Sequence, residues 1–159
     1  MSIEAAREHL KKWGRDQDII EFDASSATVP LAALAVGCEP GRIAKTLSFQ
    51  ADEGCLLIVT AGDAKIDNAK YKARFGRKAK MLTPEQALEQ TGHAVGGVCP
   101  FGVGAQVQVF LDISLKRFET VYPACGSGNS AICLTLPELE TYSGSRGWID
   151  VCKGWQEIG

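Results

Sequence analysis

Apolar residues recur along this chain at two spacings, one typical of helices and one of strands. Ile3, Ala6 and Leu10 lie three and four residues apart, so a helix is predicted over residues 2–13, ending at Gly14. Further helices are predicted between Thr28 and Gly37 and over residues 66–75, 84–90 and 137–142, with helical turns over 113–118. Strands are predicted over residues 19–22, 42–49, 55–60, 78–82, 107–112, 148–152 and, as a hairpin, 121–124 and 130–135. Because helices and strands are mixed without strict alternation, the pattern favours an α+β fold over a doubly wound sheet.

The strand around Lys45 departs from the usual pattern of a buried strand. With a period of two, Lys45 shares one face with the bulky apolar residues Ile43, Leu47 and Phe49. An ammonium group on a face that packs into the core is costly unless a cleft solvates it or a partner pairs with it. The strand therefore predicts a pocket at Lys45, and a one-residue bulge that returns Lys45 to solvent is the alternative.

Two glycine-rich segments are predicted to form irregular backbone beside this pocket. Residues 91–104 contain five glycines and a proline, and residues 125–129 read Cys-Gly-Ser-Gly-Asn. Glycine lets backbone amides approach a ligand closely. Such amides and an inward lysine suit a carbonyl or oxyanion, whereas the sequence offers little general-base equipment.

Other classes of site lack the residues that they need. The two histidines, His9 and His93, allow no defensible Ser-His-Asp set, and neither a P-loop nor a dinucleotide fingerprint is present. The six cysteines are scattered without a zinc spacing, so we expect reduced thiols, no metal, no cofactor and no catalytic cysteine. Cys99 either contacts the substrate or is a small side chain that fills the loop.

Charge and hydropathy add a location and one candidate surface. No apolar run approaches the roughly 20 residues of a membrane-spanning helix, and the first residues lack a signal pattern, so a cytoplasmic protein without a membrane partner is expected. The net charge is −2, yet residues 65–80 hold seven basic side chains against the single acid Asp67. This segment is either a local docking surface for a polyanion or a solvated helix face.

Four segments carry a resemblance to a known family. They are Ile43-Ala44-Lys45-Thr46-Leu47, Ala61-Gly62-Asp63, Gly96-Gly97-Val98-Cys99-Pro100-Phe101-Gly102 and Gly126-Ser127-Gly128-Asn129. In this order they resemble the YbaK-type aminoacyl-tRNA deacylases, relatives of the editing domain inserted in bacterial prolyl-tRNA synthetase. The resemblance covers nearly the whole chain. It implies one free-standing domain over residues 1–159, with a mixed, barrel-like sheet surrounded by helices, that hydrolyses the ester between a wrong amino acid and tRNA.

The resemblance also implies roles for individual residues. Lys45 is the expected catalytic residue, and the Gly96 to Gly102 loop is the expected wall around the aminoacyl carbonyl. Expected substrate-binding residues are Thr28, Asp63, Gly96, Gly97, Pro100, Phe101, Gly102, Gly126, Ser127 and Asn129. The basic segment, and not the resemblance, supplies the expected contacts to tRNA, which are Lys65, Lys70, Lys72, Arg74, Arg77 and Lys78. The expected partner is the acceptor end of an aminoacyl-tRNA, mischarged by prolyl-tRNA synthetase or a similar enzyme, with a synthetase as a further candidate.

Two other functions compete with deacylation. A binding module could hold aminoacyl-tRNA or a nucleotide without cleaving it, although such a module has no need of an inward Lys45. A structural or partner-binding domain could use its glycines for turns alone. Near Gly126 the sequence reads Gly-Ser-Gly-Asn-Ser-Ala-Ile, where family members vary, so the identity of the amino acid stays open.

Overall fold

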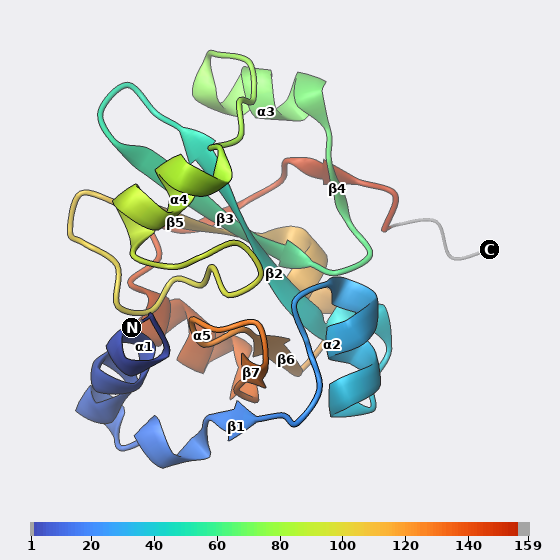
Figure 1. The fold of residues 1–159 in the computed structure, drawn as a ribbon. Coiled ribbons are helices and arrows are strands. Elements are labelled where there is room, and N and C mark those ends of the chain that lie inside the picture. The colour runs from blue at the N-terminus through green and yellow to red at the C-terminus, as the bar shows by residue number, and fades with distance from the viewer. Residues whose placement is uncertain (1, 156–159) are drawn as a thin grey trace.

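The computed structural model describes residues 2–155, with the backbone alone at Ser2 (Figure 1). Its α-helices are α1 (Ser2–Leu10), α2 (Val29–Val36), α3 (Asn68–Phe75), α4 (Pro84–Thr91) and α5 (Leu136–Ser143). Its strands are β1 (Ile20–Glu21), β2 (Ile43–Gln50), β3 (Cys55–Ala61), β4 (Lys65–Ile66), β5 (Gln108–Asp112), β6 (Thr120–Pro123), β7 (Ser130–Ala131), β8 (Leu134–Thr135), β9 (Trp148–Ile149) and β10 (Cys152–Lys153). Short 3-10 helices cover Lys11–Trp13, Asp16–Asp18, Pro40–Arg42 and Ile113–Arg117.

A mixed sheet organises the domain and confirms the α+β prediction. Its strand order is β8-β6-β2-β3-β5-β9, and two small sheets pair β1 with β7 and β4 with β10. β2 and β3 are antiparallel, whereas β6 runs parallel to β2 and β5 parallel to β3. The long β2–β3 pair crosses the middle of the molecule, with the helices arranged around it (Figure 1).

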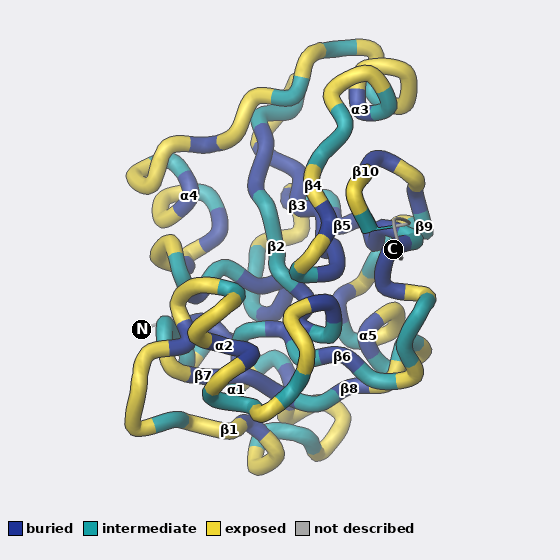
Figure 2. Tube along the Cα trace, turned by 90° about the vertical axis from the view of Figure 1, so that its right-hand side faces the viewer, coloured by how far each residue is buried: buried dark blue, intermediate teal, exposed yellow. Residues whose placement is uncertain are grey.

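The core follows the central strands. Every residue of β3 is buried, as its continuous apolar run predicts for a strand covered on both faces. Figure 2 shows the buried part of the trace along β2, β3 and β5 and exposed stretches on the outer helices and loops. None of the helices in residues 2–155 is long and apolar enough to cross a membrane.

The helix termini agree with the local sequence signals. The side chain of Thr28 accepts a hydrogen bond from Leu31 N at 3.4 Å and caps α2. Thr83 and Gln86 form the predicted capping box at the start of α4. Gly37 ends α2 with a φ of 83°, a left-handed conformation that favours glycine.

Four predicted elements are wrong in extent or pairing. The helix predicted over 66–75 begins only after β4, because Asp67 caps α3 by accepting from Ala69 N and Lys70 N. The strand predicted over 148–152 is two short strands, β9 against β5 and β10 against β4. In the predicted hairpin, β8 pairs with β6 but β7 pairs with β1. The segment 78–82 makes only an isolated bridge between Met81 and Phe49.

Candidate active site

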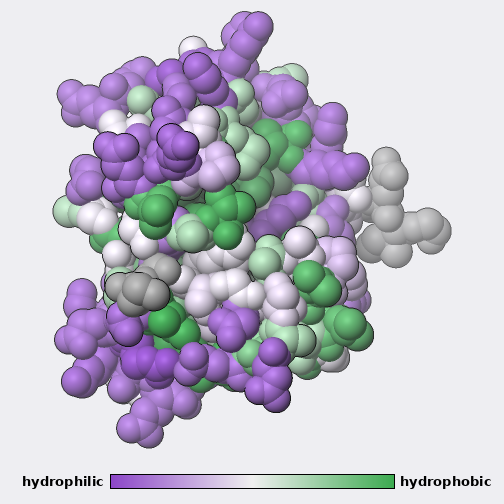
Figure 3. All heavy atoms as spheres, viewed as in Figure 1, coloured by the Kyte–Doolittle hydropathy of each residue, from purple (hydrophilic) through white to green (hydrophobic). Residues whose placement is uncertain are grey.

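A cavity of about 240 Å³ opens beside β2. Its walls come from β2, the start of α2, the loop between α4 and β5, and the segments around β6 and β7. The lining is Ser26, Ala27, Thr28, Val29, Ala32, Ile43, Ala44, Lys45, Thr46, Leu47, Ser48, Met81, Leu82, Val95, Gly96, Val98, Tyr122, Ala124, Ser130 and Ala131. Most of these side chains are small or apolar. On the face shown in Figure 3, apolar side chains gather across the middle, and strongly hydrophilic ones surround α3.

The edge of β2 that faces this cavity has a gap in its strand pairing. β6 pairs with β2 only at Ile43 and Ala44, and farther along Leu82 N donates to Ser48 O at 3.1 Å. Thr46 lies two residues before Ser48, so its N–H and C=O point toward the same edge. No strand of the described chain lies opposite Thr46 there. The gap therefore presents one backbone donor and one backbone acceptor at the cavity.

Glycines let the two glycine-rich segments meet at this site. A Cβ on Gly97 would lie 2.6 Å from Gly126 C and from Ser127 N, so no larger residue fits between the two segments. Gly96 lines the cavity at a φ of 98°, and a Cβ there would come within 3.1 Å of Ala27 Cβ. The structure thus packs Gly97 against Gly126 and Ser127, and of these residues and Gly96 only Gly96 lines the cavity.

Lys45 is half-buried in the cavity wall. β2 pairs with β3 in unbroken register from Ala44 to Gln50, so the alternative of a bulge at Lys45 is wrong. The Nζ donates hydrogen bonds to Ala64 O at 2.5 Å and Gly62 O at 3.4 Å. Burial lowers the pKa of Lys45, an effect that Lys65 increases and that Cys152 and Asp63 oppose. The ammonium therefore rests on neutral carbonyl oxygens.

Asp63 lies beside Lys45 but not in the cavity lining. Its carboxylate accepts two hydrogen bonds from Arg117, at 2.6 Å from Nη2 and 3.0 Å from Nη1. The hydrogen bonds from Arg117 lower the pKa of Asp63 below its usual range, and the Lys45 charge adds to this effect. Asp63 thus stays ionised, with both oxygens occupied by a guanidinium.

The polar residues predicted to bind substrate divide into two groups. Thr28 lines the cavity while it caps α2. Ser127 Oγ instead donates to Asn129 Oδ1 at 3.0 Å and lies 2.7 Å from Ser130 Oγ, and Asn129 Nδ2 donates to Phe22 O at 3.1 Å. Neither Ser127 nor Asn129 lines the cavity, so in this structure both hold the turn that carries Ser130 to it.

The second half of the predicted loop turns away from the cavity. Pro100 and Phe101 are buried, and Phe101 lies against the His9 ring with centroids 5.8 Å apart. A Cβ on Gly102 would be 2.7 Å from Ala5 O, so this glycine permits close packing on α1. The lining from this loop is Val95, Gly96 and Val98. The residues from Pro100 to Gly102 anchor the loop.

Cys99 lies in the core and does not line the cavity. Its Sγ is 3.6 Å from His93 Nε2, and that nitrogen lies 2.7 Å from Phe101 O. The sequence showed no recognisable Cys-His arrangement, so this pair was missed. Burial raises the pKa of the Cys99 thiol to about 12 and lowers the pKa of His93. A protonated thiol out of reach of solvent is a poor nucleophile.

The cavity also contains residues that sequence reasoning missed. Val29, Ala32, Tyr122 and Ala131 are ordinary apolar residues whose role depends on tertiary packing. Among polar groups, Ser26 Oγ and Thr46 Oγ1 are buried and have no hydrogen-bond partner among the described residues. The position of Thr46 next to Lys45 was the one local signal available.

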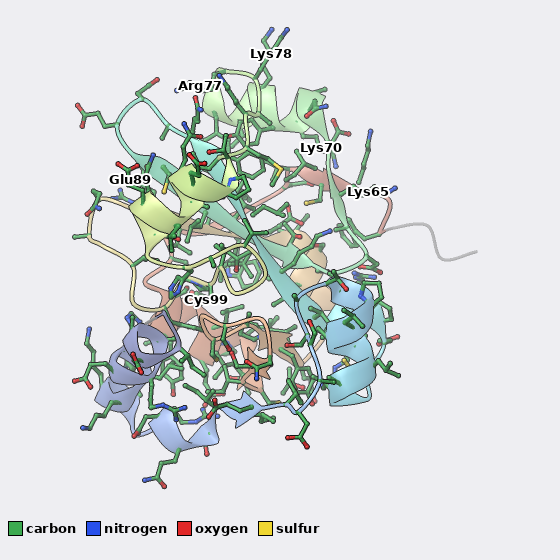
Figure 4. All side chains as sticks on the ribbon, in the orientation of Figure 1. Lys65, Lys70, Arg77, Lys78, Glu89 and Cys99 are labelled. Carbon is green, nitrogen blue, oxygen red and sulfur yellow. The ribbon has the colours of Figure 1, made fainter. Side chains whose placement is uncertain are left out.

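The six predicted tRNA contacts are spread along β4, α3 and the turn that follows. Figure 4 shows Lys65, Lys70, Arg77 and Lys78 along this upper and outer side of the molecule, well away from Cys99. Lys70 pairs with Asp150 at 3.1 Å and Arg77 with Asp52 at 2.7 Å. Arg74 lies over the rings of Phe75 and Phe110. Lys72 and Lys78 border a shallow depression and have no ion pair among the described residues.

Comparisons with known proteins agree with this fold. Residues 23–142 match the sequence model of the aminoacyl-tRNA editing domain. The chain is 56% identical to the uncharacterized protein YwhH of Bacillus subtilis (strain 168), over 98% of this chain and 100% of that protein. It is 35% identical over 69 residues to the proline--tRNA ligase of Thermotoga sp. (strain RQ2), a match that covers 43% of this chain and 12% of the ligase.

A solved structure extends the match in three dimensions. The crystal structure of a protein proposed to be a trans-editing enzyme for prolyl tRNA synthetase has a TM-score of 0.86 and 31% identity. The superposition covers 96% of this chain and 98% of that one. This α+β domain therefore has the YbaK-type editing fold, and the chain belongs to the aminoacyl-tRNA editing domain family.

Proposed function

We propose that this protein is a trans-editing deacylase, which hydrolyses the ester bond between a wrong amino acid and its tRNA. The observation that carries the proposal is Lys45, a half-buried ammonium at the wall of a small apolar cavity and next to an unpaired strand edge. Membership of the editing family supports the class of reaction. The proposed substrate is a tRNA mischarged by prolyl-tRNA synthetase or a similar enzyme, and the proposed location is the cytoplasm.

The proposed reaction needs little general-base chemistry. An aminoacyl ester is activated, so a water molecule can attack its carbonyl carbon. The bond from that carbon to the ribose oxygen then breaks, and the ribose oxygen takes up a proton that the water gave up. Where the neighbouring ribose hydroxyl attacks first, the acyl group moves to that oxygen, and water must still attack the new ester to release the amino acid. Lys45 would stabilise the negative charge that develops on the carbonyl oxygen or bind the terminal phosphate, and Thr46 N–H is a further donor at the same edge.

The size of the cavity fits an editing role. Its volume of about 240 Å³ lies below the roughly 300–1,000 Å³ of sites that hold drug-sized ligands. A space of this size suits an amino acid, with the nucleotide outside it. Amino acids that differ by one methylene are distinguished by only about 1–3 kcal/mol in a binding pocket, which is why a second selective site is useful.

A panel of mischarged tRNAs tests this function. The full chain is incubated with tRNAPro carrying alanine, cysteine, serine or proline, and with the matched correctly charged tRNAs. Single-turnover ester hydrolysis is then compared with hydrolysis in buffer. We expect faster loss of at least one wrong amino acid than of proline. Tight binding of aminoacyl-tRNA without hydrolysis would instead establish a binding module, and neither binding nor hydrolysis would overturn the proposal.

A further inference from the structure

The contacts of the Lys45 ammonium indicate that a second residue determines which groups pair with it. The turn after β3 places Asp63 between the two residues whose carbonyl oxygens hold the Lys45 ammonium, Gly62 and Ala64. A carboxylate so close to a lysine ordinarily captures it as an ion pair. Here the Asp63 oxygens bind Arg117 instead, at 2.6 and 3.0 Å.

Arg117 is itself held in place by several contacts. Its Nε donates to Ser114 O at 3.0 Å, and its Nη1 donates to Trp155 O at 3.4 Å. The guanidinium also lies over the rings of Phe118 and Trp155, with distances of 4.8 and 5.2 Å to the ring centres. The planar fork of an arginine matches both carboxylate oxygens at once, which a lysine cannot do.

The turn that carries Asp63 has little freedom to move. A Cβ on Gly62 would lie 2.2 Å from Pro40 O, so backbone packs directly on this glycine. Just before it, Ala61 N donates to Ser114 Oγ at 3.1 Å. Ser114 belongs to the same 3-10 helix, Ile113–Arg117, as Arg117. Two side chains of one short helix therefore hold this segment: Ser114 binds its backbone at Ala61, and Arg117 binds the carboxylate of Asp63.

We propose that Arg117 is a positioning residue that keeps the Asp63 carboxylate away from Lys45. The ammonium is then bound only by neutral carbonyl oxygens, which a substrate group can replace. A substrate phosphate or developing oxyanion can displace a carbonyl oxygen from an ammonium more readily than it can displace a carboxylate. The arrangement gives Asp63 a role outside the substrate cavity. This inference rests on the proposed catalytic role of Lys45.

The charged groups that act on Lys45 give the sign of the expected change. The Asp63 carboxylate favours its charged form, whereas burial and Lys65 oppose it. Without Arg117, Asp63 is free to pair with Lys45, so the pKa of Lys45 rises while the ammonium becomes less available. Removing Asp63 as well leaves nothing to capture the lysine, so the rise disappears.

Four proteins test the proposal: wild type, Arg117→Gln, Asp63→Asn and the variant with both substitutions. The pKa of Lys45 is followed by NMR of ¹³Cε-labelled lysine, with Lys45→Arg used to assign the signal. Single-turnover deacylation is measured over the same pH range. We expect Arg117→Gln to raise the pKa of Lys45 and to slow deacylation by at least about tenfold. We expect the deacylation rate of the double variant to lie within about threefold of the rate of Asp63→Asn. Such non-additivity is typical of residues that belong to one interaction network.

Controls separate this role from a merely structural one. Lys116→Gln removes a neighbouring positive charge whose Nζ lies over the Trp148 ring, whereas the carboxylate of Asp63 pairs with Arg117. It should leave the pKa of Lys45 near its wild-type value. Arg117→Lys keeps the charge but loses the fork, and should give an intermediate loss of rate. Thermal unfolding checks that each variant is folded.

Two outcomes would overturn the inference. One is an unchanged or lowered pKa of Lys45 in folded Arg117→Gln. The other is a shift in the pKa of Lys45 that is equally large when Arg117 is removed in the presence of Asp63 and in its absence, since independent charge effects are additive. The NMR titration needs no substrate, so it tests the positioning of Lys45 even if the wild-type protein fails to hydrolyse any aminoacyl-tRNA.

Discussion

The cavity and the basic segment of residues 65–80 differ in the groups that pair with their positively charged side chains. At the cavity, the single ammonium of Lys45 is half-buried and bound by two carbonyl oxygens. Along the basic segment, Lys70 and Arg77 are partly exposed and already paired with carboxylates. Thus two charges of the basic segment are matched by opposite charges, whereas the charge of Lys45 rests on neutral oxygens.

The difference shows that counting charges is a poor guide to a binding site. Exposed ion pairs contribute roughly 0–1 kcal/mol and are screened by salt. A charge in a sheltered cavity interacts with a ligand at a lower effective dielectric constant and is screened less. The cavity should therefore control the chemistry, and the basic segment should at most adjust the affinity for tRNA.

The largest expected effect is at Lys45. Lys45→Ala should slow deacylation by at least ~100-fold, the scale for losing one preorganised electrostatic donor. The fold should survive at a cost of about 1–3 kcal/mol, because the Ala64 carbonyl loses its partner. Single-turnover hydrolysis and circular dichroism measure the two effects.

Two further variants at Lys45 separate charge from packing. Lys45→Met fills similar space without a charge and should be as inactive as Lys45→Ala. Lys45→Arg should also fail to restore activity, because a planar fork cannot occupy the place of a compact ammonium. Near-normal rates in folded Lys45→Ala would remove Lys45 from the mechanism and with it the contrast between the two regions.

A smaller effect is expected in the basic segment, and the structure indicates which residues to choose. Reversing the charge of Lys72 and Lys78, which lack ion pairs among the described residues, should weaken tRNA binding. The slope of the logarithm of the association constant against the logarithm of the salt concentration should become shallower by roughly 0.7–0.9 for each phosphate that the protein no longer neutralises. Lys70→Gln with Arg77→Gln is the matched comparison and should change the slope less. An unchanged slope in the Lys72 and Lys78 variant would show that the segment is a solvated helix face and not a docking surface for tRNA.

The helix caps and the central strands could be predicted because their signals are local. Thr83 and Gln86 are three residues apart, and the β2–β3 hairpin is closed by a short turn. The pairing of β7 with β1 could not be predicted, because it depends on a segment about 110 residues earlier in the chain. Short strands carry too little pattern to specify such partners.

The same limit applies to the candidate site. Lys45 and Gly97 stand out because each breaks a local rule, a lysine in a core strand and a glycine where no Cβ fits. The pairing of Asp63 with Arg117 spans 54 residues and leaves no mark on either local sequence. Phe101 and Gly102 belong to the same predicted loop as Gly96, yet they pack on α1 and do not line the cavity.

The smallest expected effect is at Cys99, although this residue lies in the glycine-rich loop and beside a histidine. Its thiol is fully buried, and burial raises its pKa to about 12, so at neutral pH it carries its proton and is no nucleophile. In Cys99→Ser the hydroxyl can donate to Phe101 O, as the thiol does at 3.7 Å. Deacylation should therefore change by less than about tenfold, or ~1.4 kcal/mol. Cys125→Ser, at another fully buried thiol, controls for the cost of a hydroxyl in the core. Complete loss of activity in folded Cys99→Ser, with Cys125→Ser active, would make this a thiol enzyme and would transfer the chemistry from Lys45 to the core beneath the loop.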